Sequence, residues 1–333
     1  MVGATAPSVV GEIGEQPDAV ARLLEREGPS IDALAAEIGR RAPRYAVLAA
    51  RGTSDNAARY AQHLMGRFWG LPVALAAPSL HTLYDAPLRY DDALVIGISQ
   101  SGASPDVAGV VSAATAQGAL TVAITNEPDS PLAQGAQHVI GLQTGPERSV
   151  AATKTYTASL AAVAALVNGC DALFRVPEAI ARQLDHEVPA EAAASWEQLA
   201  VIGRGANYGT AFEAALKLSE LTGMVAAPWS SADFLHGPIA ILEPGFPILA
   251  IAPSGPTLPG MRELLAAAGE RGAELTVVSD APIDGRIPLE PVPEWLSPLV
   301  AVIPAQLLAV GAAEHLGRDV DRPTGLQKVT RTS

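Results

Sequence analysis

Polar residues that could bind a phosphate follow an apolar run in the first half of the chain. The run is Ala93–Ile98, and the potential hydrogen-bond donors that follow it are Ser99, Gln100, Ser101 and Ser104. Pro105 comes next and is typical of the first turn of a helix. Serine hydroxyls and the free N–H groups of a helix N-terminus can together hold a phosphate without any basic residue. A capped turn with only a structural role is the alternative, because serine is also a common N-cap.

A similar loop precedes this one. Arg51 and Gly52 follow the apolar run 45–50, and Thr53 and Ser54 come directly after them. Ligands of α/β proteins bind where the carboxyl ends of parallel strands meet, so the two loops predict one enclosed phosphate. Neither loop has the spacing of a dinucleotide fingerprint or of a P-loop, and those two kinds of site are therefore unsupported.

Three charged residues in the second half of the chain could move a proton. Glu213, Lys217 and Glu220 are spaced i, i+4 and i+7, so they share one face of a helix. A carboxylate can act as base for a proton α to a carbonyl, and a nearby lysine can tune its pKa or hold the developing oxyanion. A solvated ladder of ion pairs is the alternative. Lys217 is one of only three lysines among 22 basic residues, which favours a specific role.

Two further candidates lie in irregular segments. His236 is followed by Gly237 and Pro238, which fix it on a turn, and Lys328 lies in a tail without periodicity that is free to fold over a site. The other histidines lack the spacing of metal ligands, so we expect no metal site. We expect no organic cofactor either.

The elements that must position these residues occur twice. Arg51-Gly52 recurs as Arg204-Gly205, and Ser101-Gly102 recurs as Ser254-Gly255, each 153 residues downstream. Apolar strand runs alternate with helical patterns in both copies, which indicates parallel sheets covered by helices. We therefore predict an α/β fold with two doubly wound parallel sheets, each a three-layer α/β/α domain. The second copy has Ala252-Pro253 in place of Ser-Gln, so we expect only the first copy to bind phosphate.

The patterns divide the chain into four parts. These are an N-terminal helical segment (1–39), a first domain with the phosphate loops (40–170), a connecting helix (171–189), and a second domain with a C-terminal tail (190–333). Within the second domain, the proline-rich stretch 282–298 is predicted to be a loop and 297–317 a helix.

Composition excludes other classes of protein. The formal net charge is −13, and no cluster of basic residues offers a surface for nucleic acid or anionic membranes. The single cysteine, Cys170, excludes a disulfide framework. Residues 1–17 lack the features of a signal peptide, and apolar runs such as 158–167 are too short to cross a bilayer. We expect a soluble cytoplasmic protein.

The motifs together resemble the sugar isomerase (SIS) family, and within it the isomerase half of glucosamine-6-phosphate synthase. They are RGTS (51–54), SQSG (99–102), SVAATKTYT (149–157), EAALKLSE (213–220) and HGP (236–238), in the order of the family. The resemblance implies two SIS domains, a homodimer with its active site near the subunit interface, and a phosphosugar substrate. The serine-rich loops with Thr53 would bind the phosphate, and the backbone around Val150 and Ala152 would contact the sugar hydroxyls.

The resemblance also implies catalytic roles. Glu220 would move the proton between C1 and C2 of the sugar, and His236 would assist ring opening across the subunit interface. Lys217 would lie beside the base and the substrate oxygen, and Lys328 would reach in from the tail. Glu213 is a secondary candidate.

The departures from the synthase bear on the reaction. The synthase has a separate glutaminase domain, which is not present in this sequence, and Arg51 stands where the synthase has cysteine. Asp233 and Leu235 stand where it has glutamate and lysine. The chain thus looks most similar to stand-alone glucosamine-6-phosphate deaminases, which release ammonia and fructose 6-phosphate.

Three alternatives remain open at this point. One is a lyase or dehydratase that eliminates the C3 substituent of N-acetylglucosamine 6-phosphate, and another is a fructosamine-6-phosphate deglycase. The third is a regulator that senses phosphosugars and has no catalytic activity.

Overall fold

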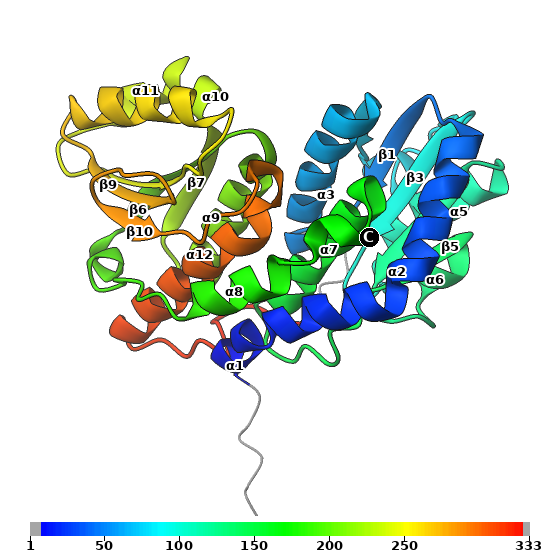
Figure 1. Cartoon of the computed structure of the whole chain (residues 1–333), viewed down its shortest axis with the longest axis horizontal. Coiled ribbons are helices and arrows are strands. Elements are labelled where there is room, and N and C mark those ends of the chain that lie inside the picture. Colours follow the sequence, from blue (N-terminus) through cyan, green and yellow to red (C-terminus); the bar gives the residue numbers. More distant parts are fainter. Residues whose placement is uncertain (1–7, 329–333) are drawn as a thin grey trace, which may run out of the picture. The chain divides into compact units, whose positions relative to one another are not determined.

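The protein contains two five-stranded parallel sheets covered by helices, as a computed structural model shows (Figure 1). The structure describes residues 8–328. Contacts group the chain into two compact units. The first-sheet unit contains residues 18–147 and 154–177, and the second-sheet unit contains residues 8–17, 148–153 and 178–328. The predicted α/β class with two parallel sheets is confirmed.

The first sheet has the strand order β2-β1-β3-β4-β5. Its strands are β1 (Tyr45–Ala49), β2 (Val73–Leu75), β3 (Ala93–Ile98), β4 (Leu120–Thr125) and β5 (His138–Gly141). Every residue of β3 and β4 is buried, which agrees with their continuous apolar sequences. The helices of this unit are α2 (Gln16–Arg41), α3 (Thr53–Leu64), α4 (Ser79–Thr82), α5 (Pro105–Ala116), α6 (Pro131–Gly135) and α7 (Lys154–Asn168).

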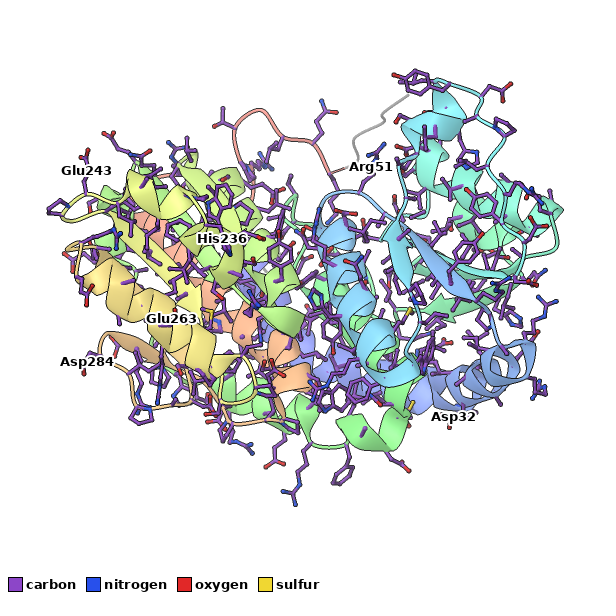
Figure 2. All side chains as sticks on the ribbon, turned by 90° about the horizontal axis from the view of Figure 1, so that it is seen from above. Asp32, Arg51, His236, Glu243, Glu263 and Asp284 are labelled. Carbon is purple, nitrogen blue, oxygen red and sulfur yellow. The ribbon has the colours of Figure 1, made fainter. Side chains whose placement is uncertain are left out.

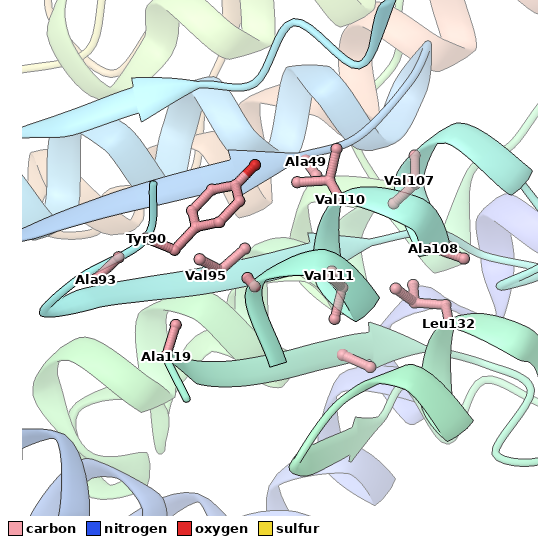
Figure 3. Close-up of a cluster of buried hydrophobic side chains, with 12 residues drawn as sticks. Ala49, Tyr90, Ala93, Val95, Val107, Ala108, Val110, Val111, Ala119 and Leu132 are labelled. Atoms are coloured by element: carbon pink, nitrogen blue, oxygen red, sulfur yellow. The ribbon is translucent and has the colours of Figure 1, made fainter. Parts of the chain in front are cut away.

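The core beneath the serine-rich loop 99–104 lies between β3 and helices α5 and α6 (Figure 3). Val95, Val111 and Leu132 are fully buried there. Gly97 permits the close packing, because a Cβ atom at this position would lie 2.6 Å from Cδ1 of Leu132 and 2.8 Å from Cγ2 of Val111. A rigid core at this point fixes the end of β3, from which the serine-rich loop leaves.

The second sheet repeats the topology of the first, with the order β7-β6-β8-β9-β10. Its strands are β6 (Gln198–Gly203), β7 (Val225–Ser230), β8 (Pro247–Ile251), β9 (Glu274–Ser279) and β10 (Arg286–Pro288). The prediction that 282–298 is a loop is wrong in one respect, because this segment contains β10. That strand has only three residues, too few for a periodic pattern, and pairing with β9 defines it.

Helices cover the second sheet as well. They are α1 (Val9–Gly14), α8 (Val176–Leu184), α9 (Tyr208–Thr222), α10 (Ser231–Leu235), α11 (Leu258–Gly269) and α12 (Ser297–His315). The segment Glu294–His315 is long and apolar enough to cross a membrane, with a mean hydropathy of 1.9. Its most apolar window is 89% buried within the structure, and α12 packs against α9. The apolar character of α12 is therefore that of a core helix.

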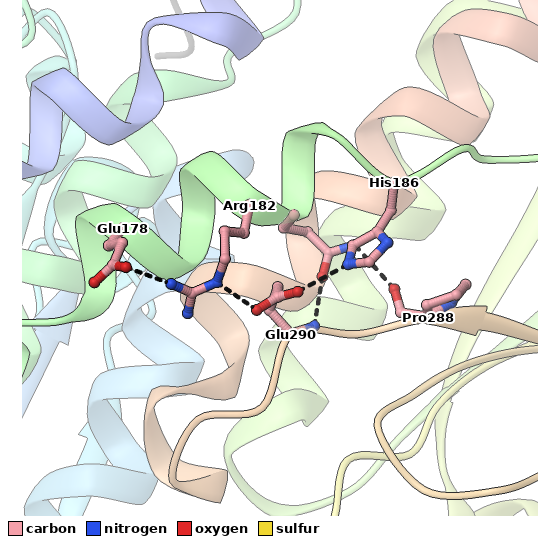
Figure 4. Close-up of polar contacts among 6 residues, drawn as sticks. Glu178, Arg182, His186, Pro288 and Glu290 are labelled. Carbon is pink, nitrogen blue, oxygen red and sulfur yellow. Dashed lines mark hydrogen bonds and ion pairs between the residues drawn. The ribbon is translucent and has the colours of Figure 1, made fainter.

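The connecting helix, predicted over 171–189, is the shorter helix α8 (Val176–Leu184). Hydrogen bonds attach this part of the chain to the segment around β10 of the second sheet. Figure 4 shows Arg182 on α8 between Glu178 and Glu290, with His186 also on Glu290. The hydrogen bond from Arg182, followed by the one from His186, lowers the pKa of Glu290. Gln183 adds bonds to the backbone on both sides, since its amide donates to the carbonyl of Pro288 and its oxygen accepts from N of Glu290.

A short segment leaves the first-sheet unit and packs with the second. Residues 148–153 follow β5, yet they group with α1 and the second sheet. Glu12 on α1 is only 2% exposed, and its carboxylate accepts hydrogen bonds from the backbone N of Arg148 (2.5 Å) and of Ser149 (3.2 Å). The segment carries Val150 and Ala152, so one buried carboxylate determines the path of residues that we expected to contact the sugar.

Replacing Glu12 by glutamine should destabilise the protein. The amide can accept from only one of the two N–H groups, and its NH₂ opposes the other. The free energy of unfolding should fall by about 1–3 kcal/mol, the usual cost of an unsatisfied buried donor. Denaturant unfolding measures the change, with Glu25→Gln on the exposed face of α2 as control. Equal stability of the two variants would contradict the assigned role of Glu12.

Candidate functional site

The two predicted phosphate loops lie side by side at one edge of the first sheet. β1 pairs directly with β3 in parallel, so their carboxyl ends meet. Arg51 and Gly52 leave β1 and lead into α3, which begins at Thr53. Residues 99–104 leave β3 and lead into α5, which has Ser104 as N-cap and Pro105 in its first turn. The structure thus brings both loops and two helix N-termini to the same edge, as the sequence predicted.

The serine-rich loop is held in a tight turn by its own side chains. Oγ of Ser99 accepts from N of Gly102 at 3.1 Å, and Oγ of Ser101 accepts from N of Ala103 at 3.3 Å. Each hydroxyl keeps its O–H as a donor. Gly102 has φ +58°, and a Cβ atom there would collide with the side chain of Ser130. The turn consequently requires glycine at this position.

Two residues that the sequence analysis did not single out support this loop from β4. Thr125 donates to the carbonyl of Gln100 (3.3 Å), and the backbone N of Asn126 donates to the same oxygen (3.1 Å). The Asn126 side chain accepts from N and Oγ1 of Thr144 and donates to the carbonyl of Gly145. Asn126 therefore ties the serine-rich loop to the segment after β5. Its position directly after a buried strand was the signal that could have identified it.

An ion pair links the two loops. Nε and Nη2 of Arg51 lie 2.8 and 2.7 Å from Oδ2 of Asp106, which is 2% exposed, and Oγ of Ser104 donates to Oδ1 at 2.6 Å. Burial alone would raise the pKa of Asp106, but the bonds from Ser104 and Arg51 outweigh it and the pKa lies below its usual value. Half of the Arg51 side chain is exposed, at the end of β1 in Figure 2. The carboxylate at the first turn of α5 thus stays ionised and is neutralised by an arginine from the other loop.

The predicted proton-transfer residues form a cluster on α9. Nζ of Lys217 lies 2.5 Å from Oε2 of Glu220 and 3.5 Å from Oε1 of Glu213. The side chains of Lys217 and Glu213 are 2% and 0% exposed, whereas Glu220 is 23% exposed. A solvated ladder is therefore excluded. The Glu220 carboxylate is the member of this cluster that solvent can reach.

Local sequence explains why α9 presents this cluster. Ala214, Leu218 and Leu221 are buried on the helix, which packs against α12, so the register of α9 is fixed by its apolar face. The helix ends at Gly223, which has φ +73° in the left-handed region that favours glycine.

His236 and Lys328 also lie in the second-sheet unit. His236 caps the short helix α10 and is exposed, where Figure 2 labels it. Ser230 donates to Asp233 at 2.6 Å and caps the same helix, which fixes the turn that carries the histidine. Lys328 is half-buried at the end of the described chain. Val150 and Ala152 are half-buried in the segment that Glu12 holds.

The predicted residues thus fall into two sets. Each set lies within one unit, and the roles of both remain predictions. Thr53, Ser54, Ser99, Gln100, Ser101 and Ser104 lie in the first-sheet unit. Glu213, Lys217, Glu220, His236, Lys328, Val150 and Ala152 lie in the second-sheet unit.

Comparison with known proteins agrees with this architecture. The profile of the SIS domain matches residues 41–169 and 194–315. A glutamine–fructose-6-phosphate aminotransferase (isomerizing) from Methanothermobacter thermautotrophicus is 36% identical over an alignment of 336 positions, which covers 95% of this chain and 56% of that protein. The chain spans little more than half the length of such curated relatives. The chain belongs to the SIS domain family and contains two SIS domains.

Solved structures extend the likeness to the whole fold. A candidate phosphosugar isomerase from Silicibacter pomeroyi is 35% identical, with a TM-score of 0.86 over 94% of this chain and 99% of that one. The C-terminal domain of glucosamine-fructose-6-phosphate aminotransferase from Francisella tularensis is 25% identical with a TM-score of 0.85, over 94% and 97% of the two chains. A glucosamine-6-phosphate deaminase from Thermotoga maritima shares the fold at 19% identity, with a TM-score of 0.75 over 96% and 98%.

Replacing Arg51 by alanine should destabilise the protein in a pH-dependent way, because Asp106 is ionised. In Arg51→Ala the buried carboxylate keeps Ser104 but loses its cation, so the protein should lose about 1–3 kcal/mol at pH 7, toward the lower figure because Arg51 is half-exposed. Because the folded pKa of Asp106 is lowered, this contribution is complete above the unfolded carboxyl pKa and disappears as pH falls through the folded value.

Urea unfolding of wild type and Arg51→Ala between pH 7 and pH 3 measures this effect. The difference should be constant down to about pH 4 and then close. Arg89→Ala, an exposed pair with Asp91, serves as control. A difference that grows on acidification would be inconsistent with an ionised Asp106.

Proposed function

We propose that the chain is a phosphosugar isomerase of SIS type that acts on glucosamine 6-phosphate and releases ammonia and fructose 6-phosphate. The observation that carries the proposal is the buried Lys217 ammonium 2.5 Å from the Glu220 carboxylate. Such a pair places a carboxylate that can take a proton beside a cation that can stabilise a developing oxyanion. Family membership and the names of its relatives support phosphosugar as the substrate class.

The proposal assigns phosphate binding to the serine-rich loops. Hydroxyls of Ser99 and Ser101 and the N-termini of α3 and α5 supply donors at the edge of the first sheet, and Ser104 is the N-cap of α5. Anchoring the 6-phosphate immobilises the substrate at a site distant from the reacting carbons, and this converts binding energy into orientation. The charge of Arg51 offsets Asp106, so the loop edge carries no net negative charge that would repel a phosphate.

The proton then moves within the open-chain sugar. Glu220 takes the proton from C2, the electron pair forms the C1–C2 double bond, and the aldehyde oxygen becomes an oxyanion that takes a proton from water. Glu220 returns its proton to C1 of this enolamine, the nitrogen lone pair forms the C2=N bond, and the iminium gives one N–H proton back to water to form the ketose imine. Water adds to C2 and ammonia leaves, which gives fructose 6-phosphate. Lys217 stabilises the oxyanion during the first step.

The other predicted residues have roles in the same proposal. His236 opens the sugar ring, Lys328 contacts the substrate from the tail, and the backbone at Val150 and Ala152 contacts the sugar hydroxyls. Glu213 sets the position of the Lys217 ammonium. We propose a cytoplasmic homodimer as the working form.

Glu220→Gln should abolish turnover and spare substrate binding. The amide cannot accept the C2 proton, while the phosphate loops are unaltered. Ammonia release from glucosamine 6-phosphate measures turnover, and calorimetric titration with the same compound measures binding. Glu263→Gln, an exposed glutamate on α11 that Figure 2 labels, is the matched control and should be fully active. An active Glu220→Gln enzyme would remove Glu220 from the mechanism.

Lys217→Arg should lower kcat at least about tenfold, which corresponds to ~1.4 kcal/mol of transition-state stabilisation. The charge is retained, but the larger planar guanidinium does not fit a buried site built around a point charge. Lys328→Arg should lose activity in the same way. The kcat of each variant is measured at saturating substrate. Near-normal turnover in both variants would show that arginine can replace these lysines.

Product analysis separates the substrate alternatives. Purified protein is incubated with glucosamine 6-phosphate and, separately, with N-acetylglucosamine 6-phosphate, and ammonia and product masses are measured. Ammonia and fructose 6-phosphate from the first compound support the proposal. A product lighter by one water from the second indicates a lyase, and the absence of any product from both contradicts the proposal.

A further inference from the structure

The second sheet contains a copy of the phosphate loops. Arg204 and Gly205 leave β6, and Ser254 and Gly255 follow β8, all 153 residues after their counterparts. The helices that follow β3 and β8 also correspond, since α5 begins at residue 105 and α11 at 258. Their N-caps are Ser104 and Thr257, again 153 residues apart.

The supporting contacts are repeated as well. In the first sheet, Thr125 donates to the carbonyl of Gln100 and accepts from N of Glu127. In the second, Ser279 donates to the carbonyl of Ala252 and accepts from N of Ala281. The second repeat thus has retained the frame of an anion-binding loop.

The surroundings of the loop glycines differ between the two repeats. A Cβ atom on Gly52 would meet no atom within 4 Å. A Cβ atom on Gly205 would lie 3.5 Å from Oε1 of Glu294, and one on Gly255 would lie 2.7 Å from Cβ of Glu294. Glu294 therefore lies against the glycines of both loops in the second repeat, whereas in the first repeat Gly52 faces open space and Gly102 packs against Ser130.

The Glu294 carboxylate uses the donor expected for an anion. Oγ1 of Thr257, the N-cap of α11, donates to Oε1 of Glu294 at 3.0 Å. In the first repeat the N-cap Ser104 donates to Asp106 of its own helix, but Pro259 occupies the corresponding position of α11. The acid at the N-terminus of α11 is thus supplied from a segment 37 residues downstream of Thr257.

Glu294 is held firmly in this position. Glu294 is 8% exposed, and its backbone carbonyl accepts a hydrogen bond from Oγ of Ser297 at 2.6 Å. Asn207, at the start of α9, donates to Oγ of Ser297 at 2.7 Å. A carboxylate fixed by its own chain has a high effective concentration and competes with any free anion.

We propose that Glu294 is an internal ligand that fills the anion-binding loops of the second repeat. The carboxylate takes the place of a phosphate, closes these loops to free phosphate, and attaches the segment after β10 to the second sheet. The negative charge is favourable at the N-terminus of α11. If the proposed function is correct, each chain therefore binds one phosphosugar. The internal-ligand role of Glu294 in the second repeat does not depend on the proposed function.

Calorimetric titration with inorganic phosphate tests the proposal on the full chain. Glu294→Ala should bind one more phosphate per chain than wild type, whatever number wild type binds. Glu294→Gln, which keeps the shape and an acceptor for Thr257, should bind the same number as wild type. Glu263→Ala, an exposed site on α11, controls for the loss of one negative charge. An unchanged stoichiometry in folded Glu294→Ala overturns the proposal.

A stability measurement covers the case in which Glu294→Ala folds poorly. Phosphate at ten times its dissociation constant should raise the Tm of this variant by about 2 °C more than that of Glu263→Ala, relative to chloride of equal ionic strength. An equal response of the two variants overturns the internal-ligand role. If wild type itself binds no phosphate, the proposed function fails while the additional site in Glu294→Ala still supports the internal ligand.

Discussion

Parallel pairing of neighbouring strands is the constraint on which the rest of this structure depends. Because β1, β3 and β4 run in the same direction, the residues that leave them meet at one edge. Arg51 reaches Asp106 and Thr125 reaches Gln100 only for that reason. The second sheet repeats the pairing, and there the meeting loops enclose a carboxylate of the chain itself.

Charge is buried in both units, and three buried charges among residues 8–328 show how it is compensated. Asp106 is neutralised by an arginine from a different loop, Lys217 lies between two glutamates, and Glu12 accepts two backbone N–H groups. Removing ions from water costs several kcal/mol each, so these clusters are poor devices for stability alone. Under the proposed function, Asp106 and Arg51 lie beside the bound phosphate and Lys217 beside the moving proton.

Much of the fold and part of the candidate site could be predicted from the sequence. The repeat of 153 residues, the buried strands and the shared face of Glu213, Lys217 and Glu220 are local or periodic patterns. Strand β10 was missed because three residues carry no period. Asn126 was missed because its bonds to Gln100 and Thr144 join distant segments, and its position directly after a buried strand was the only local signal.

The sequence by itself determined which segments become strands and helices and which polar residues end them, because side-chain periodicity and turn residues act over a few positions. Tertiary structure decided what those residues contact. It moved residues 148–153 into the second-sheet unit, buried Lys217 rather than leaving it in solvent, and placed Glu294 against Gly205 and Gly255. These outcomes depend on desolvation and on contacts across tens or hundreds of residues, which only the folded chain brings together.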